Sequence, residues 1–206
     1  MNDSLRSGRG SLVIIFYRNP ELGKVKTRLA KTIGEEMALA IYLKLSSHTR
    51  QITEQLKVDK AVYYSHFADT EDHWPNELYH KAVQQGNDLG QKMCNALAEA
   101  FARGYQRVCV IGTDCLELTP SIMDTAFLQL EKFDAIIGPA RDGGYYLLGM
   151  KKLFPEVFQN KAWSTNTVAS DTIADFKKLG LRYFCLDTLS DVDEEKDLPN
   201  SMRAGT

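Results

Sequence analysis

The chain has 206 residues, of which 44% are apolar and 25% are charged. This is the composition of a globular protein, and it excludes a disordered or fibrous chain. Acidic and basic residues nearly balance at 27 against 25, so the net charge of −2 predicts no general attraction to nucleic acid or to an anionic membrane. A chain of this length can bury one substantial core without disulfides.

No window of about 20 consecutive apolar residues is present, so a membrane-spanning helix is not expected. The first residues are polar and lack the apolar stretch of a secretory signal, so we expect a flexible tail over 1–10 and a single domain over 11–200. The four cysteines include no C-x-x-C pair, which is typical of a reduced, cytoplasmic protein. The four histidines show no metal-ligand spacing.

Strand-like and helix-like stretches alternate along almost the whole chain. Short apolar runs predict buried strands at 12–17, 60–65, 107–112, 134–138, 145–150 and 182–186. Apolar residues at helical spacing predict helices at 38–56, 91–103, 120–130 and 168–179. Thr32 with Glu35 is the predicted cap of the first helix, and Thr119 with Pro120 begins the third. No element is predicted for the acidic segment 66–79.

This order of elements predicts an α/β fold. Repeated strand–helix–strand units form a mostly parallel sheet with helices on both faces. In such sheets, ligands bind beyond the carboxyl ends of the strands. Chemistry is therefore expected in the loops that follow Tyr17, Gly112, Gly138 and Leu186.

The loop after the first strand is basic. It carries four cations within eleven residues: Arg18, Lys24, Lys26 and Arg28. Arginine offers a planar fork of donors to phosphate oxygens, and lysine offers a mobile point charge. The loop contains neither the P-loop motif nor the G-x-G-x-x-G motif, which weakens an ATPase or dinucleotide-binding interpretation. Anion binding is expected here, and a solvated basic loop is the alternative.

Carboxylates follow two later strands. Asp114 stands at the tip of the strand 107–112, where it must be paired or desolvated, and it could hold a divalent cation that bridges a diphosphate. Its alternative role is to cap the turn towards Thr119. Asp191 and Asp193 point the same way in an extended segment and could form the second half of a metal site. Alternatively, Asp193 caps the closing helix.

Two glycine-bearing loops complete the predicted site. Asp142-Gly143-Gly144 separates two apolar runs and is a hairpin signal, but its glycines also allow close approach of a ligand, and Tyr145 and Tyr146 could stack on it. Gln85, Gly86 and Asp88 precede the helix 91–103. Asp88 is a sufficient helix cap, and the same loop could contact a nucleotide base. Together these loops predict a nucleotide diphosphate with a metal ion.

Six motifs follow one another between residues 12 and 198. They are Asn19-Pro20 with Lys26-Thr27-Arg28-Leu29, Gln85-Gly86 with Asp88-Leu89-Gly90, Gly112-Thr113-Asp114-Cys115, Gly138-Pro139-Ala140 with Asp142 to Tyr146, Trp163-Ser164-Thr165, and Asp191-Val192-Asp193. The series resembles the bacterial glycosyltransferase-like family of the arsenosugar-biosynthesis type, formerly a domain of unknown function. That family belongs to the nucleotide-diphospho-sugar transferase superfamily, and it is similar to 2-phospholactate guanylyltransferases.

The resemblance implies a GT-A-like three-layer α/β/α sandwich whose mostly parallel sheet includes an antiparallel strand. It also implies that Lys26 and Arg28 bind phosphates and that Asp114 binds Mg²⁺ or Mn²⁺ with Asp193 as its partner. The side chains expected to face the sugar or the acceptor are Asp142, Tyr145, Tyr146 and Trp163.

The activity expected from these features is glycosyl transfer from a nucleotide sugar to a small-molecule acceptor. The metal and the basic loop would neutralise the charge that develops on the departing diphosphate, with Asp142 as the acceptor base. The first alternative is nucleotidyl transfer from an NTP, which releases pyrophosphate. The second is a non-catalytic nucleotide-binding protein.

Overall fold

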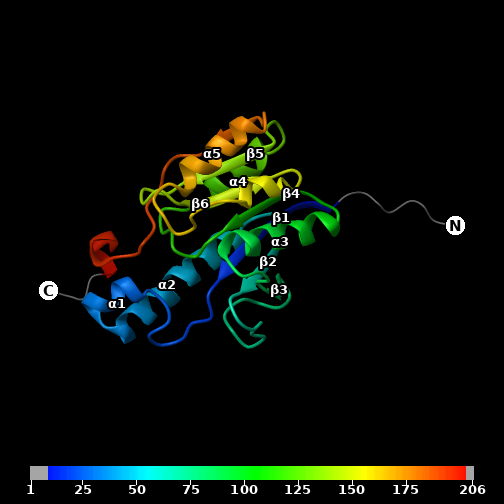
Figure 1. The fold of residues 1–206 in the computed structure, drawn as a ribbon. Coiled ribbons are helices and arrows are strands. Elements are labelled where there is room, and N and C mark those ends of the chain that lie inside the picture. The colour runs from blue at the N-terminus through cyan, green and yellow to red at the C-terminus, as the bar shows by residue number, and fades with distance from the viewer. Residues whose placement is uncertain (1–8, 203–206) are drawn as a thin grey trace.

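The computed structural model describes residues 9–202. The strands are β1 (Arg9–Tyr17), β2 (Asp59–Tyr64), β3 (Tyr79–Val83), β4 (Tyr105–Ile111), β5 (Ala135–Pro139), β6 (Tyr145–Met150) and β7 (Tyr183–Cys185). The helices are α1 (Thr27–Ile33), α2 (Glu35–Glu54), α3 (Leu89–Ala102), α4 (Pro120–Gln129) and α5 (Val168–Lys178), with short 3-10 helices η1 (Pro155–Phe158), η2 (Glu195–Asp197) and η3 (Asn200–Met202) (Figure 1).

All seven strands belong to one sheet, in the order β3-β2-β1-β4-β6-β5-β7. The pairs β1–β2, β1–β4, β2–β3 and β5–β7 are parallel, whereas β6 runs antiparallel to both β4 and β5. The carboxyl ends of the six other strands therefore lie at one edge of the sheet. The chain builds outward from β1 to β3 and then returns to add β4 on the other side of β1, so the β1–β4 boundary is a topological switch point.

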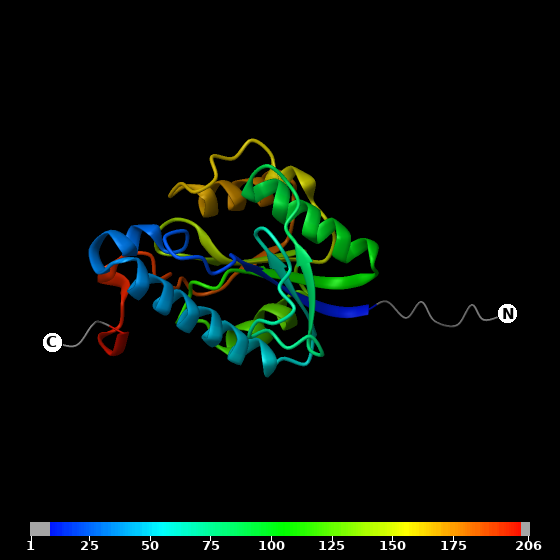
Figure 2. The same cartoon turned by 90° about the horizontal axis from the view of Figure 1, so that it is seen from below.

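Helices cover both faces of the sheet (Figure 2). On one face α2 and α4 pack on side chains such as Val13, Ile15 and Ile111. On the other face α3 and α5 pack on the alternate residues of the same strands, such as Leu12 and Ile14. The alternation follows from the period of two along a strand, and both faces are apolar because the sheet is buried on both sides. The predicted three-layer α/β/α sandwich with one antiparallel strand is confirmed.

Several boundaries differ from the sequence-based prediction. Thr32 does not cap a helix but lies inside α1, and its hydroxyl donates to the carbonyl of Leu29 at 3.0 Å. Gly34, with φ of 85°, separates α1 from α2 and is the residue before the first turn of α2. The sheet also contains β3, which no pattern predicted. It is a short edge strand in which only Tyr79 is buried, so its apolar signal is weak.

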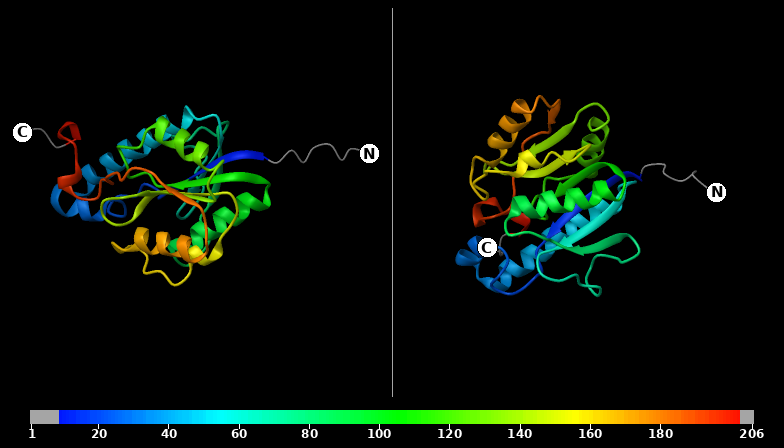
Figure 3. Two further views of the ribbon diagram at one scale, coloured as in Figure 1. Left: turned by 90° about the horizontal axis from the view of Figure 1, so that it is seen from above. Right: turned by 45° about the vertical axis from the view of Figure 1, so that its right-hand side comes forward.

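The described part of the chain begins inside the predicted tail. β1 begins at Arg9, two residues inside the predicted tail, and the rest of that tail lies outside the described residues. The C-terminal segment lies next to α1 (Figure 3), and η2 contacts that helix. Within residues 9–202, no helix combines the length and the apolar character needed to cross a membrane.

Candidate active site

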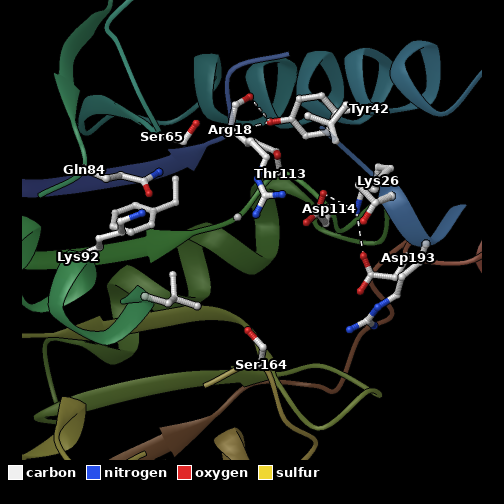
Figure 4. Close-up of a pocket in the computed structure, with 16 residues that line it drawn as sticks. Arg18, Lys26, Tyr42, Ser65, Gln84, Lys92, Thr113, Asp114, Ser164 and Asp193 are labelled. Carbon is white, nitrogen blue, oxygen red and sulfur yellow. Dashed lines mark hydrogen bonds and ion pairs between the residues drawn. The ribbon is translucent and has the colours of Figure 1, made fainter. Parts of the chain in front are cut away.

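A cavity of about 520 Å³ opens at the carboxyl edge of the sheet, beside the switch point between β1 and β4 (Figure 4). Five of the predicted site residues line it: Arg18, Lys26, Arg28, Asp114 and Asp193. They come from three distant segments of the chain. The loop after β1 supplies the cations, the tip of β4 supplies one carboxylate, and the C-terminal segment supplies the other.

Lys26 lies at the centre of this arrangement. Its side chain is only 5% exposed, and its Nζ lies 2.6 Å from Oδ1 of Asp114 and 3.1 Å from Oδ1 of Asp193. Burial lowers the pKa of the ammonium, but the two carboxylates raise it by more, so its net pKa is above the ordinary value. Lys26 also adopts a left-handed backbone conformation with φ of 46°, which is unfavourable for a non-glycine residue. This conformation immediately precedes α1.

Backbone hydrogen bonding brings the two carboxylates together. The N–H of Val192 donates to the carbonyl of Asp114 at 2.9 Å, which joins the tip of β4 to the C-terminal segment. The closing 3-10 helix η2 is capped by Glu194, whose capping box with Asp197 is complete. The predicted alternative, in which Asp193 caps this helix, is therefore wrong. The Asp193 carboxylate instead accepts a hydrogen bond from Lys26.

A third carboxylate, that of Asp191, is affected by the charges of this cluster. Burial raises the pKa of Asp191 to about 7, and the charges of Asp114, Asp142 and Asp193 add to the effect, while Lys26 opposes it. One ammonium cannot neutralise all of these carboxylates. Their mutual repulsion therefore favours the protonated form of the most buried acid. The cluster is therefore short of positive charge.

The residues of this cluster suit a hard divalent cation. Oδ1 of Asp114 is buried and lies 2.6 Å from the ammonium of Lys26. Between residues 9 and 202, no three His, Cys, Asp or Glu side chains are arranged to hold a metal by themselves. Mg²⁺ commonly uses only one or two carboxylates and completes its shell with substrate phosphates and water. Asp114 and Asp193 fit that pattern.

The basic loop is held rigidly against the sheet. The hydroxyl of Tyr42 accepts a hydrogen bond from the N–H of Arg18 at 3.0 Å and donates to the Arg18 carbonyl at 2.7 Å. Asn19 is 2% exposed, and its side-chain amide donates to the carbonyl of Phe67 while its Oδ1 accepts from the N–H of His66. Neither anchor was predicted from the sequence. Asn19 was visible only as part of an Asn-Pro pair, and Tyr42 as one member of an apolar helix stripe.

Five further residues line the cavity, namely Phe16, Ser65, Gln84, Leu89 and Lys92. Figure 4 shows Ser65, Gln84 and Lys92 on the side away from Asp114 and Asp193. Gln84 is fixed there by a hydrogen bond from its Nε2 to the carbonyl of Tyr63 at 2.8 Å. These residues stand at the ends of β1, β2 and β3 and in α3. Gln84 and Leu89 belong to the loop 84–90 that was expected to contact a nucleotide base, and both line the cavity.

The remaining predicted residues do not line the cavity. Lys24 is exposed and pairs with Glu21. Asp88 caps α3 by accepting from the N–H of Gln91, so its structural alternative is confirmed. Gln85 and Gly86 belong to the exposed turn between β3 and α3, where Gly86 has φ of 139°.

Tyr146 is buried, whereas Tyr145 and Trp163 are half-buried and pack against the core. Tyr146 is 4% exposed, and its hydroxyl donates to the carbonyl of Asp187, while the hydroxyl of Tyr145 contacts the sulfur of Met93 at 3.6 Å. The ring of Trp163 lies against Gly90, where an added Cβ would stand 2.4 Å from it. The next residue along, Ser164, does line the cavity.

The turn between β5 and β6 is a hairpin, as its Asp-Gly pair predicted. Oδ1 of Asp142 accepts from the N–H of Gly144 at 2.8 Å. Gly143 has φ of 92°, and a Cβ there would meet the carbonyl oxygen of Asn166 at 1.9 Å. Gly143 therefore has a structural explanation. Asp142 itself is exposed, and its charge still acts on Asp191.

Comparison with known proteins identifies the family. The family model DUF2064, described as an uncharacterized protein conserved in bacteria, matches residues 48–165, which is more than half of the chain. The chain belongs to the DUF2064 family. No curated protein matches the sequence of this DUF2064 protein.

Several solved structures have folds similar to that of this chain. A candidate nucleotide-diphospho-sugar transferase from Desulfovibrio desulfuricans G20 is 31% identical to the DUF2064 protein, with a TM-score of 0.84 over 94% of this chain and 90% of its own. The inositol-1-phosphate CTP transferase from T. maritima has a TM-score of 0.54 at 14% identity, over 92% of each chain. Glucosyl-3-phosphoglycerate synthase from Mycobacterium tuberculosis, solved with Mn²⁺ and UDP, has a TM-score of 0.53 at 13% identity, over 90% of this chain and 72% of its own. The predicted nucleotide-diphospho-sugar transferase fold is therefore confirmed.

Proposed function

We propose that this protein is a metal-dependent transferase that binds the diphosphate of a nucleotide sugar in the cavity beside β1 and β4, and transfers the glycosyl group to a small-molecule acceptor. The observation that carries the proposal is the convergence of Lys26 on Asp114 and Asp193 within one cavity. A cation-lined wall next to paired carboxylates matches the charge pattern of a diphosphate with its divalent ion. The finer assignment to the arsenosugar-biosynthesis type belongs to this proposal.

Each group has a distinct role in the proposed reaction. Arg18, Lys26 and Arg28 bind phosphate oxygens and stabilise the negative charge that develops as the diphosphate leaves. Asp114 and Asp193 would hold Mg²⁺ or Mn²⁺, which supplies Lewis-acid stabilisation of the same charge. The rigid anchoring of the loop by Tyr42 means that its donors are preorganised.

Asp142 is the proposed acceptor base. Its carboxylate is exposed on the β5–β6 turn, and it lies near enough to raise the pKa of Asp191. It does not line the cavity, so the acceptor would have to bind between this turn and the diphosphate. We expect the reaction to take place in the cytoplasm, where the cysteines, all free in the structure, stay reduced.

Nucleotidyl transfer is the second candidate, and one observation favours it. Four cations line the cavity, namely Arg18, Lys26, Arg28 and Lys92, which is enough positive charge for a triphosphate. In that reaction an acceptor attacks the α-phosphate of an NTP and pyrophosphate leaves. The metal and the basic loop would stabilise the leaving group in the same way.

The product released distinguishes the two reactions. The protein is incubated with Mn²⁺, a panel of nucleotide sugars or NTPs, and sugar and phospho-acid acceptors, and the products are separated by ion-exchange chromatography. Release of a nucleoside diphosphate identifies glycosyl transfer, and release of pyrophosphate identifies nucleotidyl transfer. Binding without either product across the panel would contradict both, and the Asp114→Asn variant is the control for activity of the site.

A further inference from the structure

Lys26 contacts the same two carboxylates that are the proposed ligands of the divalent cation. Its Nζ lies between Oδ1 of Asp114 and Oδ1 of Asp193, and dashed lines mark both contacts in Figure 4. The two carboxylate side chains are 42% and 37% exposed, whereas the lysine side chain is 5% exposed. The Lys26 ammonium therefore lies on the side of the two carboxylates that faces the protein interior, and it borders the cavity.

We infer that Lys26 is an internal counter-ion that competes with the divalent cation for Asp114 and Asp193, so that metal and nucleotide bind cooperatively. The inference rests on the proposed function, because it takes these two carboxylates as the metal ligands. It goes further in assigning to Lys26 a second role besides phosphate binding. In the nucleotide-free protein Lys26 neutralises the carboxylates, and in the nucleotide complex it turns to the phosphates.

The competition follows from distance. Carboxylate oxygens bind Mg²⁺ at roughly 2.0–2.1 Å. The Nζ of Lys26 already lies 2.6 and 3.1 Å from one oxygen of each carboxylate. A metal ion and an ammonium on the same two carboxylates would lie only a few ångströms apart, and their repulsion would be weakly screened at a buried lysine. Metal binding therefore requires Lys26 to give up at least part of its contacts.

A phosphate provides the replacement partner. Moving a buried ammonium off its carboxylates leaves an unpaired charge, which is costly. A phosphate bound in the cavity beside Arg18 and Arg28 would form an ion pair with the flexible Lys26 side chain. This new pair would remove that cost. Nucleotide binding then frees the carboxylates for the metal, and by reciprocity the metal strengthens nucleotide binding by the same factor.

Titration calorimetry with MnCl₂ alone tests the inference without any nucleotide. Lys26→Met removes the ammonium but keeps an unbranched side chain of similar length, and its left-handed backbone is as strained as that of lysine. We expect this variant to bind Mn²⁺ at least tenfold more tightly than the wild type. Lys24→Met changes the same charge on the same loop, outside the cavity, and we expect its Mn²⁺ affinity to stay within twofold of the wild type.

Unchanged Mn²⁺ affinity in Lys26→Met would overturn the inference. Adding Asp114→Asn to this variant separates that failure from a failure of the proposed function. If the double variant loses the Mn²⁺ that Lys26→Met binds, the metal site stands whether or not Lys26 competes for it. If it binds Mn²⁺ as before, the carboxylates are not the metal site and both proposals fall. Lys26→Gln is measured in parallel, because it retains a hydrogen-bond donor should Met disturb folding.

Discussion

The backbone N–H of Val192 donates to the carbonyl of Asp114 at 2.9 Å, so the tip of β4 and the C-terminal segment share one hydrogen bond directly behind the carboxylate pair. Val192 itself is 3% exposed and packs in a small cluster with Leu29 of α1 and Ile41 of α2. The C-terminal segment therefore packs against α1, the helix that follows the basic loop, and also forms a hydrogen bond with the tip of β4. The position of Asp193 depends on packing that lies far from it in the sequence.

Asp193→Asn tests whether this position serves the metal. The substitution removes one of two proposed ligand charges but preserves the size of the side chain, so we expect Mn²⁺-dependent nucleotide binding to weaken at least tenfold with little change in the melting temperature. Glu195→Gln, on the exposed surface of η2, is the matched control and should bind as the wild type does. Equal binding by both variants would exclude Asp193 from the metal site.

Asp191 gives the protein a predictable dependence of stability on pH. Its pKa is 3.8 for the free side chain and about 7 in the folded protein, so it is protonated in both states below pH 3.8 and carries no cost there. As the pH rises from 3.8 to 7 the unfolded chain loses its proton first, and the folded state is progressively destabilised. Above pH 7 the whole cost is present.

Asp191→Asn removes this cost, and the measurement is urea unfolding in EDTA at pH 5 and at pH 8. We expect the variant to be more stable than the wild type at pH 8, by at least about 1 kcal/mol, since each tenfold change in proton affinity is worth about 1.4 kcal/mol. The gain should be smaller at pH 5. A gain of the same size at both pH values would show that the charge of Asp191 is not its cause.

Tyr42→Phe tests the anchoring of the basic loop. The phenol bridges the N–H and the carbonyl of Arg18, so its loss should cost about 1–2 kcal/mol of stability and weaken nucleotide binding several-fold. Tyr105→Phe is the control. Its hydroxyl bonds to Asp59 at the other end of the sheet, so we expect a similar loss of stability in thermal denaturation with unchanged nucleotide affinity. Equal losses of affinity in both variants would contradict the anchoring role.

Gly90→Ala tests how the segment that carries Ser164 is held. An alanine Cβ would stand 2.4 Å from the ring of Trp163, so the ring must move, and we expect a loss of about 1–3 kcal/mol in urea unfolding although alanine favours a helix. The double variant Gly90→Ala with Trp163→Leu should lose less than the sum of the two single variants. Additive losses would show that the glycine and the indole are not coupled.

The fold was predictable because its signals are local. Buried strands such as 107–112 are continuous apolar runs, and Asp88 and Thr119 are caps that the structure retains. The strand β3 and the helix α1 were missed for a physical reason. β3 is a partly exposed edge strand, and α1 is a short helix that directly follows a strained lysine, so neither has the periodicity of a long element.

The candidate site was predictable in part for a different reason. Polar residues after strands identified Lys26, Asp114 and Asp193, because parallel strands bring their carboxyl ends to one edge. The roles of Tyr145, Tyr146 and Trp163 could not be read from order along the chain. Whether an aromatic ring faces a cavity or the core depends on side-chain packing, and these rings pack inward on residues such as Met93 and Gly90.

The most direct test of the whole account is calorimetric binding of ADP, CDP, GDP and UDP, each with and without MnCl₂, to the wild type and to Asp114→Asn. We predict that at least one of the four nucleotides binds the wild type at least tenfold more tightly with Mn²⁺, and that Asp114→Asn loses this gain. If every nucleotide that binds does so equally well with and without Mn²⁺, or equally well to both proteins, the account is contradicted.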